Sequence, residues 1–537
     1  MKVLFIGGTA SQVLAAAALQ RRGVDCMVIS AAPELEAPWL AVQLCDLYDH
    51  PDATRSTRLP PGLSLLHIKL AKDVTDPIKK TFVETSVASF WASSPLVTLA
   101  STLQTDPYFR FEEAALPALS LSELIPLPVS THSLLHCKQY STSQRRAILR
   151  FLRALREFVQ SAYFWTLEET ERGPSDRVAL GDNDDTRYIL EALQAGETAL
   201  EVGNKFRVPE TFLRQVLRVP LSDLPNVPFS DLLVIVIYLL QSFGAYRPTT
   251  AHLVLEYGLS DVAQTFERFV FSAGGLVLRD CQLRFEDKQI LIDLPTSEHV
   301  PFQPDCICLS SPEVLPTFRR FFFILRQGDL LIELQGLYSE EHYNYQLIIP
   351  SGLVLLRVGS NKALPRDYFS IDFVALSDSK LGGFLNGEEA LTVLQMELSA
   401  ALGMTMDVWE DTCLVSLVFD FDYATYLRAA YSEDWEKRFA VYSCQQIPRL
   451  EVRSPGTNHV HPHPPPPGQE QLHIPAGGED KLLFPILEEA DHFIRHVLRF
   501  AEGETNDTNE CAWYCDLHLT RRRAACSRLF QTKSEAR

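Results

Sequence analysis

The chain has 537 residues, 46% of them hydrophobic, and a formal net charge of −19. This composition is typical of a large globular protein with a substantial core, and it excludes fibrous and disordered classes. Because 68 acidic residues outnumber 49 basic ones, it also argues against a nucleic-acid binder, whose affinity depends on neutralising phosphates.

Two further counts bear on where the protein resides. The longest apolar run, residues 232–240, is far shorter than the roughly 20 residues that a membrane-spanning helix needs. The 11 cysteines are an odd number spread over the whole chain, which favours free thiols over a disulfide framework. We therefore expect a cytoplasmic protein.

Residues 2–30 have the pattern of a strand–helix–strand unit. Residues 3–6 form an apolar strand, a tight turn begins at Gly7, and a helix rich in alanine and leucine follows at 11–22, with Ser11 as its expected N-cap. A second strand is expected at 24–29. Such a unit predicts an α/β fold with a parallel sheet of the Rossmann type.

The turn of this unit departs from the dinucleotide-binding motif G-x-G-x-x-G. Gly7 and Gly8 open it, but Thr9 and Gln12 stand at its third and sixth positions. Ser30 stands where an acidic residue would bind the ribose. The sequence therefore predicts a Rossmann-type unit that binds no nucleotide and no other cofactor.

The middle of the chain is helical. Helices are expected at 144–155, 186–195, 208–217 and 229–243, each with apolar residues at helical spacing. They predict an all-helical lobe, domain II, at 128–245, inserted into a discontinuous α/β domain I formed by 1–127 and 246–500.

Strand patterns return after residue 246. They are expected at 275–278, 289–293, 321–325, 345–349, 370–375, 414–419 and 439–443. A Pro-rich linker at 453–480 precedes a helix at 485–498, whose apolar face comprises Ile486, Ala490, Phe493 and Val497. We expect a disordered tail at 502–537.

Motifs for metal binding and catalysis are weak. Cys306 and Cys308 lack the paired spacing of a structural zinc site, and three histidines at 459–463 alternate within the Pro-rich linker. The sequence contains no nucleophile elbow, phosphate-binding P-loop or zinc-protease motif. We therefore expect no metal site, and the sequence shows no candidate catalytic residues.

The segment 257–269 combines a glycine turn with a short helix that starts near Ser260. Asp261, Gln264 and Arg268 are spaced to share one face of this helix. Its core face is expected to comprise Val262, Phe266 and Phe269. On spacing alone, the polar face is most simply a solvated one.

This segment resembles the signature of the Rab escort protein and Rab GDP-dissociation-inhibitor superfamily, Tyr-Gly-x-Gly-Glu-Leu-Pro-Gln-x-Phe-x-Arg. The residues that match are Tyr257, Gly258, Gln264, Phe266 and Arg268. Asp261 replaces the glutamate of the signature.

Other segments resemble the same superfamily in the same order. Residues 129–152 are similar to the entry of its helical lobe, and 414–448 together with 485–498 are similar to the C-terminal part of escort proteins. The resemblance implies an FAD/NAD(P)-binding-like fold with mixed sheets and an inserted helical lobe. It also implies a Rab-binding surface at Tyr257, Asp261, Gln264 and Arg268.

The implied function is that of a non-catalytic escort subunit, without cofactor. Such a protein binds newly made, GDP-bound Rab GTPase, presents it to the Rab geranylgeranyl transferase heterodimer, shields the attached isoprenoid and delivers the Rab to a membrane. The residues of the helical lobe expected to face the transferase or the lipid are Arg146, Phe151, Leu239 and Phe243. Two alternatives stay open: a Rab GDP-dissociation inhibitor that recycles prenylated Rabs, and a flavin-dependent oxidoreductase of the same fold.

Overall fold

The structure is a computed structural model. It describes residues 1–31, 39, 41–48, 59, 61–84, 89–94, 96–97, 99–100, 111–114, 131–137, 139–160, 184–242, 251–255, 258–286, 289–296, 298–310, 317–326, 344–358, 364, 367–377, 379–431, 449–451 and parts of 486–498. The strand expected at 439–443, the linker at 453–480 and the tail at 502–537 lie outside the described residues, so these expectations stay predictions.

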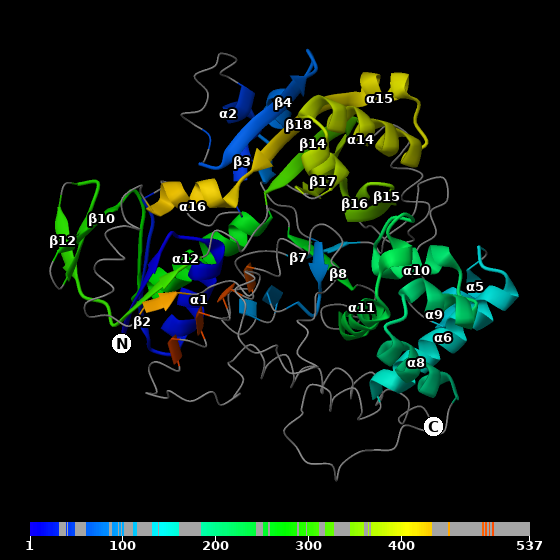
Figure 1. Ribbon diagram of the computed structural model, residues 1–537. Coiled ribbons are helices and arrows are strands. Elements are labelled where there is room, and N and C mark those ends of the chain that lie inside the picture. Colours follow the sequence, from blue (N-terminus) through cyan, green and yellow to red (C-terminus); the bar gives the residue numbers. More distant parts are fainter. Residues whose placement is uncertain are drawn as a thin grey trace, which may run out of the picture.

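A five-stranded parallel sheet contains the N-terminal unit (Figure 1). Its strands lie in the order β19 (Arg449–Glu451), β13 (Cys306–Leu309), β1 (Lys2–Ile6), β2 (Asp25–Ile29) and β9 (Leu276–Leu278). Helix α1 (Ala10–Arg21) follows β1 and packs against α12 (Leu259–Ser272). The three central strands, β13, β1 and β2, are mainly apolar and buried, as expected for a parallel sheet covered on both faces.

The N-cap of α1 is Thr9, so the expectation of Ser11 was wrong. The Thr9 hydroxyl accepts from the amide of Gln12 at 3.4 Å, and the Gln12 side chain accepts from the amide of Thr9 at 3.3 Å. This capping box satisfies two amides that the helix leaves unpaired, and it starts the helix one residue before Ser11.

A nine-stranded mixed sheet forms the centre of the molecule. In order, its strands are β4 (Leu63–Leu70), β18 (Cys413–Phe421), β14 (Phe318–Arg326), β17 (Tyr368–Leu376), β16 (Gly352–Val358), β15 (Asn344–Ile349), β7 (Phe111–Ala114), β8 (His252–Leu255) and β6 (Ser89–Trp91). All its pairs are antiparallel except β15 with β7.

Strand β14 shows how this sheet divides the core into two layers. Phe321 and Phe323 pack with α14 (Gly387–Ala401) and α15 (Met406–Thr412), where the rings of Phe323 and Trp409 are 5.4 Å apart. Phe318 and Phe322 join the core of the five-stranded sheet. Successive side chains of a strand point to opposite faces, so each face of β14 has its own apolar cluster.

Smaller elements surround these sheets. They are the sheet β10 (Gln282–Glu286), β11 (Gln289–Asp293) and β12 (His299–Phe302), the pair β3 (Ala41–Gln43) and β5 (Phe82–Glu84), the helices α2 (Leu44–Tyr48), α3 (Asp76–Lys79) and α16 (Tyr423–Tyr431), and the π-helix η5 (Lys380–Phe384).

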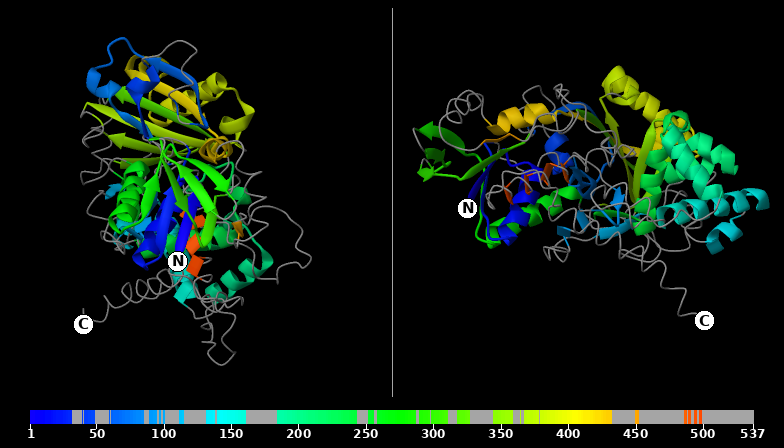
Figure 2. Two further views of the ribbon diagram at one scale, coloured as in Figure 1. Left: turned by 90° about the vertical axis from the view of Figure 1, so that its left-hand side faces the viewer. Right: turned by 60° about the horizontal axis from the view of Figure 1, so that its bottom comes forward.

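A helical lobe lies at the other end of the molecule from the five-stranded sheet (Figures 1 and 2). Its elements are α5 (Thr131–His136), α6 (Thr142–Gln160), α8 (Asp184–Ala195), α9 (Ala199–Phe206), α10 (Glu210–Leu217), the 3₁₀ turn η4 (Leu224–Asn226) and α11 (Phe229–Ser242). All fall within the expected bounds of domain II, 128–245, which themselves stay a prediction.

An aromatic joint connects the lobe to the nine-stranded sheet. The guanidinium of Arg218, which ends α10, lies 5.7 Å from the ring centre of Trp91 on β6 and donates to Ser89 at 2.9 Å. The ring of Trp91 also lies 4.1 Å from that of His252 on β8 and 6.4 Å from that of Tyr238 on α11. Burial and the nearby Arg218 hold the pKa of His252 well below its ordinary value, so the joint contains a neutral imidazole.

The C-terminal helix contributes to the core of the five-stranded sheet. Its described residues between 486 and 498 are helical, and Ile486, Ala490, Phe493 and Val497 are all buried, as the spacing predicts. The ring of Phe493 meets that of Phe5 on β1 edge to face at 5.7 Å.

Among the described helices, none combines the length and the apolar character that a membrane span requires.

Candidate functional site: helix α12 and the charged pocket at its start

Helix α12 has a core face and a solvent face, which we call the platform. Leu259, Val262, Phe266 and Val270 are buried in the core of the five-stranded sheet. Phe269, also expected on the core face, is half-buried and packs against the same core. Apolar contacts of its core face therefore hold the helix against the five-stranded sheet and leave the platform facing solvent.

The platform contains most of the residues that the sequence singled out. Gln264 and Arg268 are exposed, and Asp261 is half-buried near the start of the helix. Phe271 lies three residues beyond Arg268, on the same side, and is 68% exposed. Sequence reasoning missed Phe271. Its position as an aromatic residue next to a predicted polar face was the signal that could have identified it. Tyr257 lies outside the described residues.

The start of α12 is tied to strand β5. Gly258 precedes the helix with φ of 91°, and the amide of Leu259 donates to the Glu84 carboxylate at 3.2 Å. A Cβ placed on Gly258 would lie 1.5 Å from a Glu84 oxygen, so glycine is required both for the backbone angle and for the space. The carboxylate occupies the positive end of the helix, where an anion is favoured.

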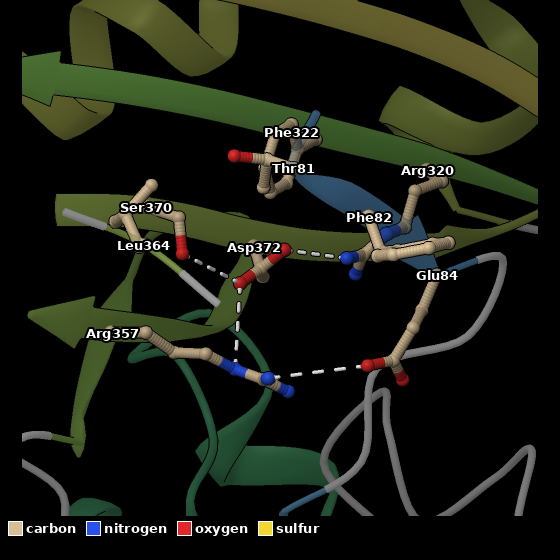
Figure 3. Close-up of a pocket in the computed structure, with 9 residues that line it drawn as sticks. All are labelled: Thr81, Phe82, Glu84, Arg320, Phe322, Arg357, Leu364, Ser370 and Asp372. Atoms are coloured by element: carbon tan, nitrogen blue, oxygen red, sulfur yellow. Dashed lines mark hydrogen bonds and ion pairs between the residues drawn. The ribbon is translucent and has the colours of Figure 1, made fainter. Parts of the chain in front are cut away.

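Glu84 also lines a small charged pocket (Figure 3). The cavity has a volume of about 40 Å³, room for a few water molecules. Its lining comprises Thr81, Phe82, Glu84, Arg320, Phe322, Arg357, Leu364, Ser370 and Asp372. These residues come from β5, β14, β16, β17 and the segments beside them.

A chain of opposite charges crosses this pocket. Arg320, only 1% exposed, donates to Asp372 at 2.5 Å, and Ser370 donates to the other oxygen of Asp372 at 3.4 Å. Arg357 lies between the two acids, 3.8 Å from Asp372 and 4.0 Å from Glu84 (Figure 3). The four charges thus link the central sheet to the first turn of α12.

Burial raises the pKa of Glu84 from 4.5 to about 7. The neighbouring Arg357 and Arg320 and the Leu259 amide oppose this rise, whereas Asp372 adds to it. Glu84 is therefore a carboxyl group that can gain or lose a proton near neutral pH, at the base of the platform.

Sequence reasoning missed this pocket, although it left a signal. Arg320 and Asp372 each stand within a run of apolar strand residues, FRRFFFILR and YFSIDFVAL. A charge inside such a strand needs a partner, because an isolated buried charge is costly. Which partner it meets depends on strand pairing, which the local pattern does not contain.

The residues predicted to face transferase or lipid lie apart in the lobe. Arg146 is exposed on α6. Phe151 and Leu239 are buried in the core of the lobe, where the ring of Phe151 lies 5.2 Å from that of Phe206. Phe243 lies outside the described residues. Such packing is what any helical core requires, so a lipid-facing role stays a prediction.

In the part of the chain that the structure describes, no group of three or more His, Cys, Asp or Glu side chains is arranged to hold a metal ion. The described cysteines are free, with Cys26 buried on β2 and Cys306 and Cys308 buried on β13, the two strands that flank β1. Burial raises the pKa of Cys26 to about 12, so this thiol stays protonated at neutral pH.

No family model matches the chain, and no curated protein matches it. Among solved structures, a Rab GDI from Plasmodium falciparum aligns with 78% of this chain and 88% of its own, with a TM-score of 0.52 and 13% identity. The fold resembles that of a Rab GDI.

More distant matches are oxidoreductases. One from Methanosarcina mazei has a TM-score of 0.45 and 10% identity over 80% of this chain and 90% of its own. Putrescine oxidase has a TM-score of 0.42 and 10% identity over the same shares. The GDI likeness and the observed sheets confirm the predicted fold class, an FAD/NAD(P)-binding-like α/β fold with mixed sheets and a helical lobe. At 13% identity the likeness concerns the fold alone.

Proposed function

We propose that this protein binds Rab small GTPases through the platform and acts as a Rab escort protein. The observation that carries the proposal is the platform itself, because Gln264, Arg268 and Phe271 project from a helix whose opposite face is buried. A rigid helix needs no ordering on binding, so little conformational entropy is lost when a partner docks. The GDI-like fold and the matching signature residues support the same assignment.

The chemistry of the platform suits a protein partner. Arg268 offers a planar set of donors for carboxylates or backbone carbonyls, and Gln264 can both donate and accept. Phe271 adds an aromatic group, a residue type enriched at the core of protein interfaces. A polar and aromatic surface of this kind favours a GTPase surface over a small-molecule substrate.

In the proposed cycle, the protein receives GDP-bound Rab in the cytoplasm and presents it to the geranylgeranyl transferase, which docks on the helical lobe near Arg146. The lobe then shields the isoprenoid until the Rab reaches a membrane. The protein itself performs no catalysis. A GDP-dissociation inhibitor would share the platform but recruit no transferase.

Reconstitution distinguishes these functions. Purified protein is mixed with unprenylated GDP-bound Rab, transferase and geranylgeranyl donor, and lipid transfer to the Rab is measured. Transfer that requires this protein supports the escort function. Rab binding without transfer, combined with extraction of prenylated Rab from vesicles, supports the inhibitor. If neither form of Rab binds, the proposal is wrong.

A further inference from the structure

The turn between β1 and α1 is closed by a carboxylate from the other end of the chain. Glu489 is 5% exposed, and one of its oxygens accepts from the hydroxyls of Ser11 and, at 3.2 Å, Ser310. The hydroxyl of Thr9 lies 2.9 Å from each of these two serine oxygens. Three hydroxyl groups and one buried carboxylate thus form a single cluster.

This cluster lies where the fold would bind phosphate. In dinucleotide-binding proteins of this architecture, the pyrophosphate sits at the N-terminus of the helix that follows the first strand, beside the carboxyl ends of the parallel strands. Ser11 is in the first turn of α1, and Ser310 directly follows the neighbouring strand β13. The Glu489 carboxylate therefore lies where the fold would bind the pyrophosphate of a dinucleotide.

The remaining residues of the turn do not fit a dinucleotide. Residues 7–12 are all buried. The amides of Thr9 and Gln12, which a phosphate would use, are taken by the capping box, and the Gln12 side chain donates to the Ile6 carbonyl at 2.7 Å. Thr9 and Gln12 also occupy two glycine positions of the binding motif, of which the first allows close approach of the pyrophosphate and the second allows close packing of the helix on the strand.

Glu489 is held in place by the helix that contains it. Phe493, one turn further on, packs on Phe5, and Ala490 and Ile486 are buried beside it. Glu489 thus lies on the buried face of its helix, where a charge is costly unless it is compensated. The serine hydroxyls and the N-terminal end of α1 provide that compensation.

We propose that Glu489 is an internal substitute for the dinucleotide phosphate, which closes the site to flavin and nicotinamide cofactors and anchors the C-terminal helix to the five-stranded sheet. The site beneath it keeps its affinity for anions. Removal of the carboxylate would therefore open an anion site that accepts acetate or inorganic phosphate. This inference does not depend on Rab binding.

The test is chemical rescue of the Glu489→Ala variant of the full chain. Its melting temperature is measured with sodium acetate, sodium phosphate or sodium chloride at equal ionic strength. Acetate and phosphate are expected to raise the melting temperature saturably, by ~2–4 °C at saturation, whereas chloride is not. Wild-type protein and the control Glu201→Ala are expected to show no saturable rise, only the general, non-saturating stabilisation that such salts give to folded proteins. Glu201 caps an exposed helix start and closes no site.

Each outcome decides the proposal. Equal effects of the three salts on the folded variant would overturn it, as would stoichiometric binding of FAD or ADP to the wild-type chain in calorimetry. If Glu489→Ala does not fold, refolding yield replaces the melting temperature, and the proposal requires acetate or phosphate to restore it. The Glu489→Gln variant, which keeps the volume but not the charge, is expected to be destabilised without rescue by either anion.

Discussion

The Glu84 carboxylate accepts a hydrogen bond from the backbone amide of Leu259 at 3.2 Å, although the two residues are 175 positions apart. A side chain of β5 thereby completes the first turn of α12, the helix that presents the platform. The same carboxylate lies 4.0 Å from Arg357, so the platform and the charged pocket share one group. This contact underlies the first two predictions.

Replacement of Gly258 by alanine is expected to destabilise the protein strongly. The new Cβ would meet the Glu84 carboxylate at 1.5 Å, in addition to the cost of a positive φ. Gly196→Ala controls for a positive φ alone, because Gly196 has φ of 69° and nothing within 4 Å of its Cβ, whereas Gly258, with φ of 91° and ψ of −172°, lies in a region that essentially only glycine adopts. Urea unfolding should show a loss of roughly 1 kcal/mol for the control and on the order of 3 kcal/mol or more for Gly258→Ala. Equal losses would mean that Glu84 moves aside freely.

Glu84 is expected to make stability depend on pH. Because its pKa is raised from 4.5 to about 7 in the folded protein, the folded state keeps a proton that the unfolded chain has released. Its stabilising contribution is therefore complete below pH 4.5 and is lost as pH rises through 7, with a slope of at most about 1.4 kcal/mol per pH unit. Glu84→Gln should remove this component. Urea unfolding of the wild type and of Glu84→Gln at pH 5, 6 and 7 measures the difference between their free energies of unfolding. If the two free energies change in parallel with pH, the prediction is contradicted.

The Arg268→Ala substitution is expected to weaken Rab binding without affecting folding. Its side chain is exposed, so its removal leaves the core intact, but alanine has none of its forked donors. If the contact is desolvated in the complex, the loss is on the order of 2–5 kcal/mol in binding free energy. Arg187→Ala, on the exposed surface of α8 in the lobe, is the control. Calorimetric titration with GDP-bound Rab checks this, with thermal melts to confirm folding; unchanged affinity would place the Rab site elsewhere.

Breaking the buried pair between Arg320 and Asp372 is expected to be costly. Asp372→Asn leaves the guanidinium of Arg320 buried with its charge no longer balanced by this carboxylate, a loss of about 3–5 kcal/mol. Asp185→Asn, which breaks the pair with the largely exposed Arg150, should cost about 0–1 kcal/mol. The double variant Arg320→Met/Asp372→Leu should recover much of the stability, because it removes both charges together. Urea unfolding of the wild type and the three variants is the measurement, and a double variant less stable than Asp372→Asn would contradict this explanation.

The elements with a strong local pattern were predictable from the sequence. The apolar strand at 3–6, the helices of the lobe and the two faces of α12 follow from spacing alone, since periodicity of 2 or 3.6 residues determines which side chains share a face. The error concerns a detail that depends on neighbours: Thr9 rather than Ser11 caps α1.

The sequence by itself determined the N-terminal Rossmann-type unit, the helical lobe and the polar face of α12, because each depends on residues close together in the chain. Only the tertiary structure decided which distant charges meet. Glu84 reaches Leu259 across 175 positions, and Glu489 reaches Ser11 across 478. Such contacts depend on strand order and helix packing, which are set by burial of the whole core, and a local pattern contains no record of them.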